Sequence, residues 1–181
     1  MNNPEFAQLC SRAWSLPVLA HLAESGHGRV SPTAHALGAG RRIIGETFLH
    51  LAQLGLLERA PGHGHPLRPE FVLSSRGSSV AAWAQEFLVR MSTSDWAAMR
   101  RAWALPVLRL VSEPQTFGSL RGQLDPVTDR ALSLCLTRLT QPGWVERRVE
   151  PAVRPPQVSY LAQGRGLLIS SSLQETFSFA R

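Results

Sequence analysis

Two copies of one pattern occur in this sequence, and the repeat constrains the fold more than any other feature. Arg12–Leu19 recurs 89 positions later as Arg101–Leu108, with a single difference, Ser15 against Ala104. Periods of about 20–50 residues indicate solenoids, whereas a much longer period indicates a duplicated globular domain. A chain of 181 residues is compatible with one domain or two. The repeat favours two, covering residues 1–90 and 91–181.

The second copy has the clearest secondary-structure pattern. Leu132, Leu136 and Leu139 follow the i, i+4, i+7 spacing of an amphipathic helix. Gly143 is a residue typical of helix ends, and the WVER sequence after it indicates a half-buried strand. The first copy has the same pattern in the same order, at Ile44, Phe48, Leu51, Gly55 and the LLER sequence from Leu56. A weaker match places residues 71–77 opposite residues 158–164.

Each half is predicted to contain helices, a short extended segment and a β-hairpin, in the order of a winged helix-turn-helix. The third helix is expected at 41–54 and at 128–141, and other helices at 6–13, 78–90 and 167–179. Ser15, Ser31 and Ser94 are expected as N-caps, because serine oxygens accept the free N–H groups of a first helical turn. The predicted fold is mostly α with small β-wings (α+β), with two tandem winged helix-turn-helix domains related by a pseudo-two-fold axis. Domains this small cannot bury the apolar sides of their outer helices by themselves. We therefore expect the two halves to pack together through their end helices, around Trp83, Phe87, Trp96 and Leu173.

The composition indicates a globular protein with a polyanionic partner. Hydrophobic residues make up 44% of the chain and charged residues 18%, which is typical of ordered domains. The net charge is +6, with +2 before Met91 and +4 from there on, and every basic residue is an arginine. No apolar run approaches the ~20 residues that span a bilayer, and we find no signal peptide. We therefore expect a cytoplasmic, nucleoid-associated protein without membrane contact.

The second half resembles the HxlR family of bacterial winged-helix regulators, which are relatives of MarR. The resemblance is based on Thr116–Leu120, Val127–Thr128, the three leucines above, Gly143, Glu146–Arg147 and Pro155–Tyr160. The first half is a weaker copy, in which Arg29-Val30, Leu54–Arg59 and Leu73–Gly77 match. Members of this family are usually single-domain chains that dimerise through their outer helices to bind a palindrome. The resemblance therefore implies a DNA-binding transcriptional regulator whose two copies act as a pseudo-dimer in one chain, or a homodimer through the outer helices.

The third helix of each half is the predicted DNA-reading element. A recognition helix needs short polar side chains and arginines on the face that enters the major groove, and arginines in the wing can neutralise phosphates. Asp129 and Glu46 also lie on these predicted faces, and Glu46 would face phosphates. The candidate contacts with double-stranded DNA are Arg41, Arg42, Gly45, His50, Arg59 and Arg68 in the first half, and Thr128, Arg130, Ser133, Thr137, Arg138, Arg147, Arg148 and Arg154 in the second.

Other chemistry has weaker support in the sequence. Cys10 is a possible redox site, because some relatives sense oxidants through an N-terminal cysteine, and Arg12 offers it a positive neighbour. Cys135 reads as a small packed residue. The His63-Gly64-His65 sequence lacks a companion ligand cluster, so we predict no metal and no cofactor. No catalytic motif has a fitting context, and we predict that the protein is not an enzyme.

Two other functions remain open from the sequence. Tandem winged helices also serve as protein-interaction modules, and they can bind DNA without sequence preference as architectural proteins. Arginines on the third helix and wing favour DNA, whereas a large exposed apolar patch would favour a protein partner. We expect the second half to provide most of the DNA affinity, because it has twice the net charge of the first.

Overall fold

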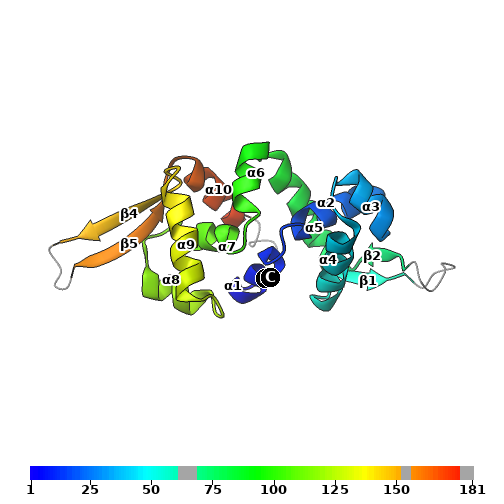
Figure 1. Ribbon diagram of the computed structural model, residues 1–181, viewed down its shortest axis with the longest axis horizontal. Coiled ribbons are helices and arrows are strands. Elements are labelled where there is room, and N and C mark those ends of the chain that lie inside the picture. Colours follow the sequence, from blue (N-terminus) through cyan, green and yellow to red (C-terminus); the bar gives the residue numbers. More distant parts are fainter. Residues whose placement is uncertain (61–68, 152–155, 176–181) are drawn as a thin grey trace. The chain divides into compact units, whose positions relative to one another are not determined.

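The computed structural model describes residues 1–60, 69–151 and 156–175 (Figure 1). This part of the chain contains ten helices and five strands, an α+β composition with small antiparallel sheets, as predicted. None of the helices in these ranges is long and apolar enough to cross a membrane.

The chain forms two compact units. Arg12–Ala97 make up one, here called the N-unit, and Met1–Ser11 together with Ala98–Arg181 make up the other, the C-unit. This division differs from the expected ranges 1–90 and 91–181 mainly in helix α1 (Asn3–Cys10), which belongs to the C-unit. The second boundary falls within α6 (Thr93–Met99).

The N-unit follows the predicted order of elements. Its helices are α2 (Ser15–Ser25), α3 (Val30–Ala36), α4 (Arg41–Gln53) and α5 (Ser75–Val89), and its hairpin consists of β1 (Leu57–Arg59) and β2 (Phe71–Leu73). The two strands are antiparallel, and Gly28 forms an isolated bridge to Phe71. The rings of Phe48 and Phe71 stack at 4.9 Å between centroids, which joins α4 to the hairpin. Leu19, Leu22, Ile44 and Leu51 complete the buried core.

The C-unit has the same order with a longer hairpin (Figure 1). Its elements after α6 are α7 (Ala104–Leu110), β3 (Gln115–Thr116), α8 (Phe117–Gln123), α9 (Asp129–Thr140), β4 (Val145–Glu150), β5 (Gln157–Ala162) and α10 (Gly164–Glu175). The sheet order is β3-β5-β4, all antiparallel. Helix α7 packs against α9, and α8 packs against β3 and β5. The buried side chains of the three helices include Leu108, Leu120, Leu132, Leu136 and Leu139.

Glycines at matching places have the same roles in both units. Gly55 follows α4 with φ 68°, and Gly143 follows α9 with φ 73°, so both predicted helix stops are confirmed. A Cβ atom on Gly77 would lie 1.9 Å from the carbonyl oxygen of Leu56, and one on Gly166 would lie 2.0 Å from that of Trp144. Only glycine permits this close approach of the helix to the residue that precedes the first hairpin strand.

These contacts correct the weakest part of the repeat alignment. Arg59 pairs with Phe71 across the first hairpin, and Arg147 pairs with Tyr160 across the second. Phe71 therefore corresponds to Tyr160, and the expected match of residues 71–77 with 158–164 is wrong by two positions. The error arose because the shared strand pattern repeats every two residues, so a shift of two leaves the alternation unchanged.

The predicted N-caps were wrong by one or two residues. Ser15 is the first residue of α2, directly after Trp14, and its buried hydroxyl has no hydrogen-bond partner among the described residues. In α3 the cap is Arg29, and Ser31 lies inside the helix. The Ser92 hydroxyl, rather than that of Ser94, accepts from the Asp95 N–H at 3.1 Å, while the Asp95 carboxylate accepts from the Ser92 N–H. A capping box explains this shift, since it needs a carboxylate three residues after the cap.

The outer helices also begin earlier than predicted. A second capping box, formed by Asn2 and Glu5, places α1 at Asn3–Cys10 instead of 6–13. The Ser74 side chain accepts from the Gly77 N–H, so α5 begins at Ser75 rather than 78. Similarly, α10 begins at Gly164 instead of 167.

Candidate nucleic-acid interface

Helix α9 has one buried side and one polar side, as predicted. Thr128 is its N-cap, and its hydroxyl accepts from the Ala131 N–H at 3.2 Å. Leu132, Leu136 and Leu139 are no more than 3% exposed. The other side exposes Thr128, Asp129, Arg130, Ser133, Leu134, Thr137 and Arg138. The five candidate contacts on this helix therefore lie together and face solvent.

The charges on this face are positive and largely uncompensated. Within the described residues, the guanidinium groups of Arg130 and Arg138 form no hydrogen bond or ion pair. The one carboxylate on the face, Asp129, is paired with Arg121 of α8. This pair also ties the first residue of α9 to the preceding helix. Arg130 and Arg138 are consequently available for an external anion or for base edges.

The second hairpin presents two more candidate residues. Arg147 and Arg148 are both exposed on β4. Arg148 donates to the Glu146 carboxylate, with its Nη2 2.7 Å from Oε2, whereas Arg147 has no such pair in the described part of the chain. Arg154 lies outside the described residues. Of the two candidates on β4, Arg147 therefore has the less compensated charge.

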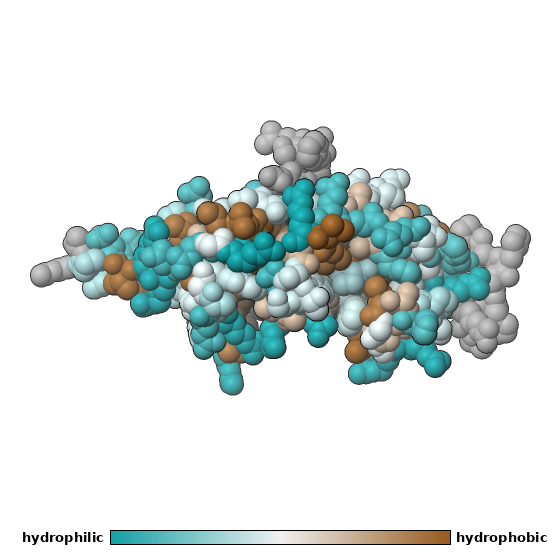
Figure 2. Space-filling model, turned by 90° about the horizontal axis from the view of Figure 1, so that it is seen from above, coloured by the Kyte–Doolittle hydropathy of each residue, from teal (hydrophilic) through white to brown (hydrophobic). Residues whose placement is uncertain are grey.

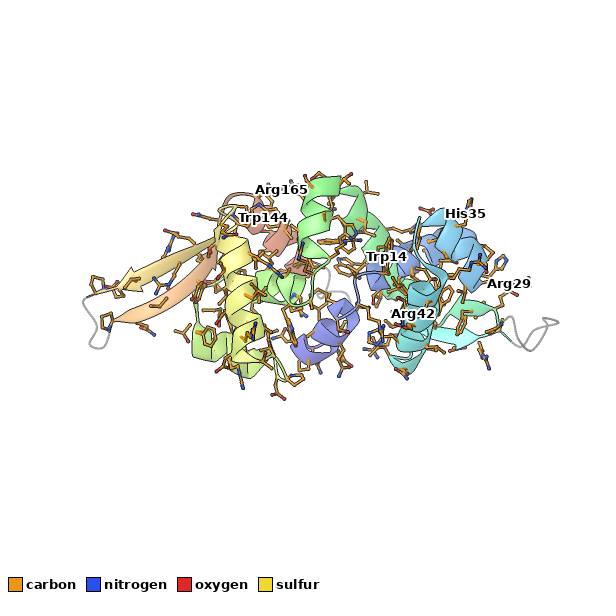
Figure 3. The ribbon with its side chains drawn as sticks, viewed as in Figure 1. Trp14, Arg29, His35, Arg42, Trp144 and Arg165 are labelled. Atoms are coloured by element: carbon orange, nitrogen blue, oxygen red, sulfur yellow. The ribbon has the colours of Figure 1, made fainter. Side chains whose placement is uncertain are left out.

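Helix α4 of the N-unit has a different solvent face. Arg41 and Arg42 are exposed, and Gly45 and His50 are half-buried. The Glu46 carboxylate lies between two guanidiniums, 3.1 Å from Arg42 Nη1 and 3.3 Å from Arg12 Nη1, and Arg42 projects from α4 in Figure 3. One carboxylate therefore neutralises part of the charge that this helix could offer to DNA.

Two apolar side chains on α4 were not recognised from the sequence. Ile43 is 43% exposed and Leu49 is 58% exposed. Leu49 occupies the position that Thr137 has in α9. The sequence does indicate this exposed leucine, because Leu49 lies on the side of the helix opposite Ile44, Phe48 and Leu51 and so breaks the amphipathic pattern. On the β1 strand Arg59 is exposed, as expected, whereas Arg68, His63 and His65 lie outside the described residues.

The comparison with known families concerns the C-unit. Residues 98–181 match the HxlR-like helix-turn-helix family. A match to this family suggests a DNA-binding transcriptional regulator. The HxlR-like segment includes α7 to α10 and the whole C-unit hairpin, and it leaves out α1 and the N-unit. No curated protein was found to match the sequence.

The two cysteines are both buried. Burial raises the pKa of Cys10 well above its usual range, and the Arg109 guanidinium only partly offsets this effect. The expected positive neighbour, Arg12, pairs with Glu46 instead. In the HxlR-like segment, burial raises the pKa of Cys135 to about 12, with Arg138 opposing the shift. Both environments disfavour the thiolate, which is the reactive form.

No grouping of three or more histidine, cysteine or acidic side chains within 1–60, 69–151 and 156–175 could hold a metal ion. His27 instead takes part in a polar cluster, with its Nε2 3.3 Å from the Glu70 carboxylate, which also pairs with Arg29. This cluster holds the start of α3 close to β2.

Proposed function

We propose that this protein is a DNA-binding transcriptional regulator and that α9 is its main recognition helix. The observation that carries the proposal is the solvent face of α9, where the guanidiniums of Arg130 and Arg138 have no ion pair within the described residues. Short polar side chains, Ser133 and Thr137, lie between them. Arginine can bind guanine through two parallel hydrogen bonds, and serine or threonine can approach any base edge. The family match of residues 98–181 supports the same function.

In this proposal the wing and the helix have different tasks. Arg147 on β4 would contact phosphate, which positions the C-unit along the duplex without reading sequence. Arg130 and Arg138 would lie in the major groove, as in other helix-turn-helix proteins. The remaining candidate contacts of the C-unit are Thr128, Ser133, Thr137, Arg148 and Arg154.

We further propose that the N-unit is a second winged helix and that one chain acts as a pseudo-dimer on DNA. Support comes from the repeated sequence, from the same order of helices and strands, and from the paired Gly77 and Gly166 approaches. The N-unit would contact DNA through Arg41, Arg42, Gly45, His50, Arg59 and Arg68. Because Glu46 compensates Arg42 and Arg12, we assign the larger share of affinity to the C-unit.

A protein-interaction role is the alternative for the N-unit. Ile43 and Leu49 are exposed on α4, at the place where the C-unit has Ala131 and Thr137. Such side chains suit a protein surface better than a DNA groove. Figure 2 shows hydrophobic residues only in small separate groups on the face it presents, and on that face this pattern favours DNA over a protein partner.

The test starts from DNA selected by the protein itself. Duplexes of about 30 base pairs would be selected from a random pool, and binding to a selected duplex and to the unselected pool would be measured by fluorescence anisotropy at several salt concentrations. Replacing Arg130 and Arg138 by Ala should weaken binding to the selected duplex by about 1–3 kcal/mol for each arginine that reads a base. Binding to the pool should change much less.

Two matched variants complete this test. The first variant replaces Arg41 and Arg42 by Ala and removes the same charge from α4. We expect it to lose less affinity for the selected duplex than the Arg130/Arg138 variant. The second variant replaces Arg100 and Arg101 by Ala and removes the same charge outside both third helices. We expect its affinity for the selected duplex and for the pool to fall by a similar small factor. If the selected duplex and the pool lose equal affinity in the Arg130/Arg138 variant, these arginines contact only phosphate. Failure of the wild-type protein to prefer any duplex would refute the regulator proposal.

A further inference from the structure

Helix α1 completes the C-unit, although the family match covers only residues 98–181. Phe6 and Leu9 have no exposed surface. The Arg109 guanidinium of α7 lies over the Phe6 ring, 5.2 Å from its centroid, and its Nη2 donates to the Met1 carbonyl oxygen at 3.4 Å. A stacked, hydrogen-bonded arginine fixes a helix more tightly than apolar contact alone.

The first turn of α1 also joins a polar network around α8. The Asn3 amide donates to Gln123 Oε1 at 3.3 Å. Gln123 in turn donates to Gln115 Oε1 and to the Ser119 hydroxyl, each at 3.1 Å, and the Ser119 hydroxyl donates to Gln115 Oε1 at 2.6 Å. Four side chains from α1, β3 and α8 are thus connected through Gln123.

The residues of this network lie in elements that contact both the β4–β5 hairpin and helix α9, the two proposed DNA-contacting elements. Its member Gln115 lies in β3, which pairs with Tyr160 of β5 in the hairpin sheet. Its members Ser119 and Gln123 lie in α8, which is linked to the start of α9 by the Arg121–Asp129 ion pair. The placement of α8 relative to the hairpin therefore depends on side chains that α1 helps to hold.

The N-unit has no counterpart of these side chains. In the N-unit Gly28 forms a bridge to Phe71, and in the C-unit Gln115 pairs with Tyr160. Because Phe71 corresponds to Tyr160, Gly28 corresponds to Gln115. The same alignment places Pro32 and Ala36 of α3 opposite Ser119 and Gln123 of α8. None of these three residues can donate or accept through a side chain. The network is therefore a feature of the C-unit and not a general requirement of this architecture.

We propose that α1 is a positioning element for DNA recognition by the C-unit. Through Asn3 and Gln123 it fixes α8 against β3, and it thereby holds α9 and the β4–β5 hairpin in the one arrangement that reads a specific site. This inference rests on the proposed DNA-binding function. Asn3 and Gln123 themselves are positioning residues that need not touch DNA.

The test is a double-mutant cycle in the full-length protein. Asn3→Ala, Gln123→Ala and the combined variant would be titrated against the duplex selected by the wild-type protein and against the unselected random pool. We expect Asn3→Ala to bind the selected duplex about 3-fold more weakly and Gln123→Ala about 10-fold more weakly, the range expected for lost single hydrogen bonds. The pool should bind all variants within about 2-fold of wild type, since phosphate contacts tolerate small changes in placement.

Non-additivity is the decisive result. If Asn3 acts through Gln123, the combined variant should be no weaker than Gln123→Ala alone, because the second substitution removes a bond already lost. Losses that simply multiply would overturn the proposal. Pro4→Ala, on the same helix but exposed, is the control and should leave both affinities unchanged.

Hydrogen exchange separates this proposal from the proposed function. Exchange at the α8 amides, measured without DNA, should be several-fold faster in Asn3→Ala than in wild type or Pro4→Ala. Unchanged exchange in α8 would refute the positioning role even if DNA binding is weakened. If the wild-type protein binds no selected duplex but α8 exchange still increases in Asn3→Ala, the regulator function fails and the link from α1 to α8 stands.

Discussion

Replacement of Glu46 by Leu should increase the affinity of the protein for DNA. Glu46 forms ion pairs with both Arg12 and Arg42, at 3.3 Å and 3.1 Å. The corresponding residue of α9 is Leu134, which is 47% exposed in the same kind of helix. The substitution therefore copies a residue that this architecture already accommodates. It releases the guanidinium of Arg42 on the proposed DNA-facing side of α4 and that of Arg12, which precedes α2.

The expected gain follows from counterion release. Each additional phosphate contact makes the slope of log affinity against log salt steeper by about 0.9, which corresponds to about 5-fold tighter binding at ~0.15 M salt. One or two new contacts thus predict a slope steeper by about 0.9–1.8. The free energy of unfolding should change little, by about 0.2–1 kcal/mol per pair lost, because the Arg12, Arg42 and Glu46 side chains are 42%, 86% and 42% exposed.

Anisotropy titrations of Glu46→Leu on random duplex DNA, at salt concentrations between about 0.05 and 0.3 M, measure this slope. Glu46→Gln keeps the size of the side chain and should give most of the same effect, since the change is one of charge. The converse variant, Leu134→Glu, should weaken binding by placing a carboxylate on α9. If Glu46→Leu and Glu46→Gln both leave the slope at the wild-type value, α4 does not lie against phosphates, and the N-unit has another role.

Three further predictions concern stability and pH. Ser15→Ala should raise the free energy of unfolding by about 1 kcal/mol in urea titrations, because it removes a buried hydroxyl that has no partner in the described part of the chain, and because the second copy has Ala104 at the equivalent place. A loss of stability would mean that the hydroxyl is hydrogen-bonded in solution. Gly77→Ala should lower the free energy of unfolding by more than about 2 kcal/mol, because its Cβ would lie 1.9 Å from the Leu56 carbonyl oxygen, while Gly118→Ala, with nothing within 4 Å, should not. Burial raises the pKa of Cys135 from 9.0 to about 12, so its thiol keeps its proton in the folded state while the unfolded chain loses it. The contribution of Cys135 to the free energy of unfolding is therefore fully present below pH 9, and it falls as the pH rises from 9 to 12, by up to about 1.4 kcal/mol per pH unit. In Cys135→Ala the free energy of unfolding should decline less steeply over this pH range than in wild type. Equal slopes in the two proteins would contradict the raised pKa.

Much of the fold could be predicted because it depends on local periodicity. The spacing of Leu132, Leu136 and Leu139 sets the buried side of α9, and all three are buried. Gly55 and Gly143 end the third helices as expected, because a left-handed residue after a helix favours glycine. The polar face of α9 follows from the same spacing, so the exposed candidates on that helix were identifiable from the sequence alone.

Features that depend on distant neighbours could not be predicted. Trp14 and Trp103 have nearly identical flanking sequences, yet the φ angle is −103° at Trp14 and 72° at Trp103. Local preferences cannot explain two backbone conformations for one sequence. The ion pairs of Glu46 could not be predicted for the same reason, because its contact with Arg12 joins residues that are 34 positions apart in the sequence. Only the fold shows that the carboxylate is already engaged.

The assignment of α1 to the C-unit has a specific physical reason. Phe6 and Leu9 show that this helix needs an apolar partner, but the repeat provides two similar ones, since Leu16–Leu19 of α2 and Leu105–Leu108 of α7 have the same sequence. The apolar pattern alone therefore cannot decide between them. The difference lies in the polar residues beside it. Arg109 and Gln123, which hold Met1, Phe6 and Asn3, are replaced in the first copy by Ala20 and Ala36. Apolar spacing thus determines that α1 must be buried, and two side chains that occur only in the second copy determine where.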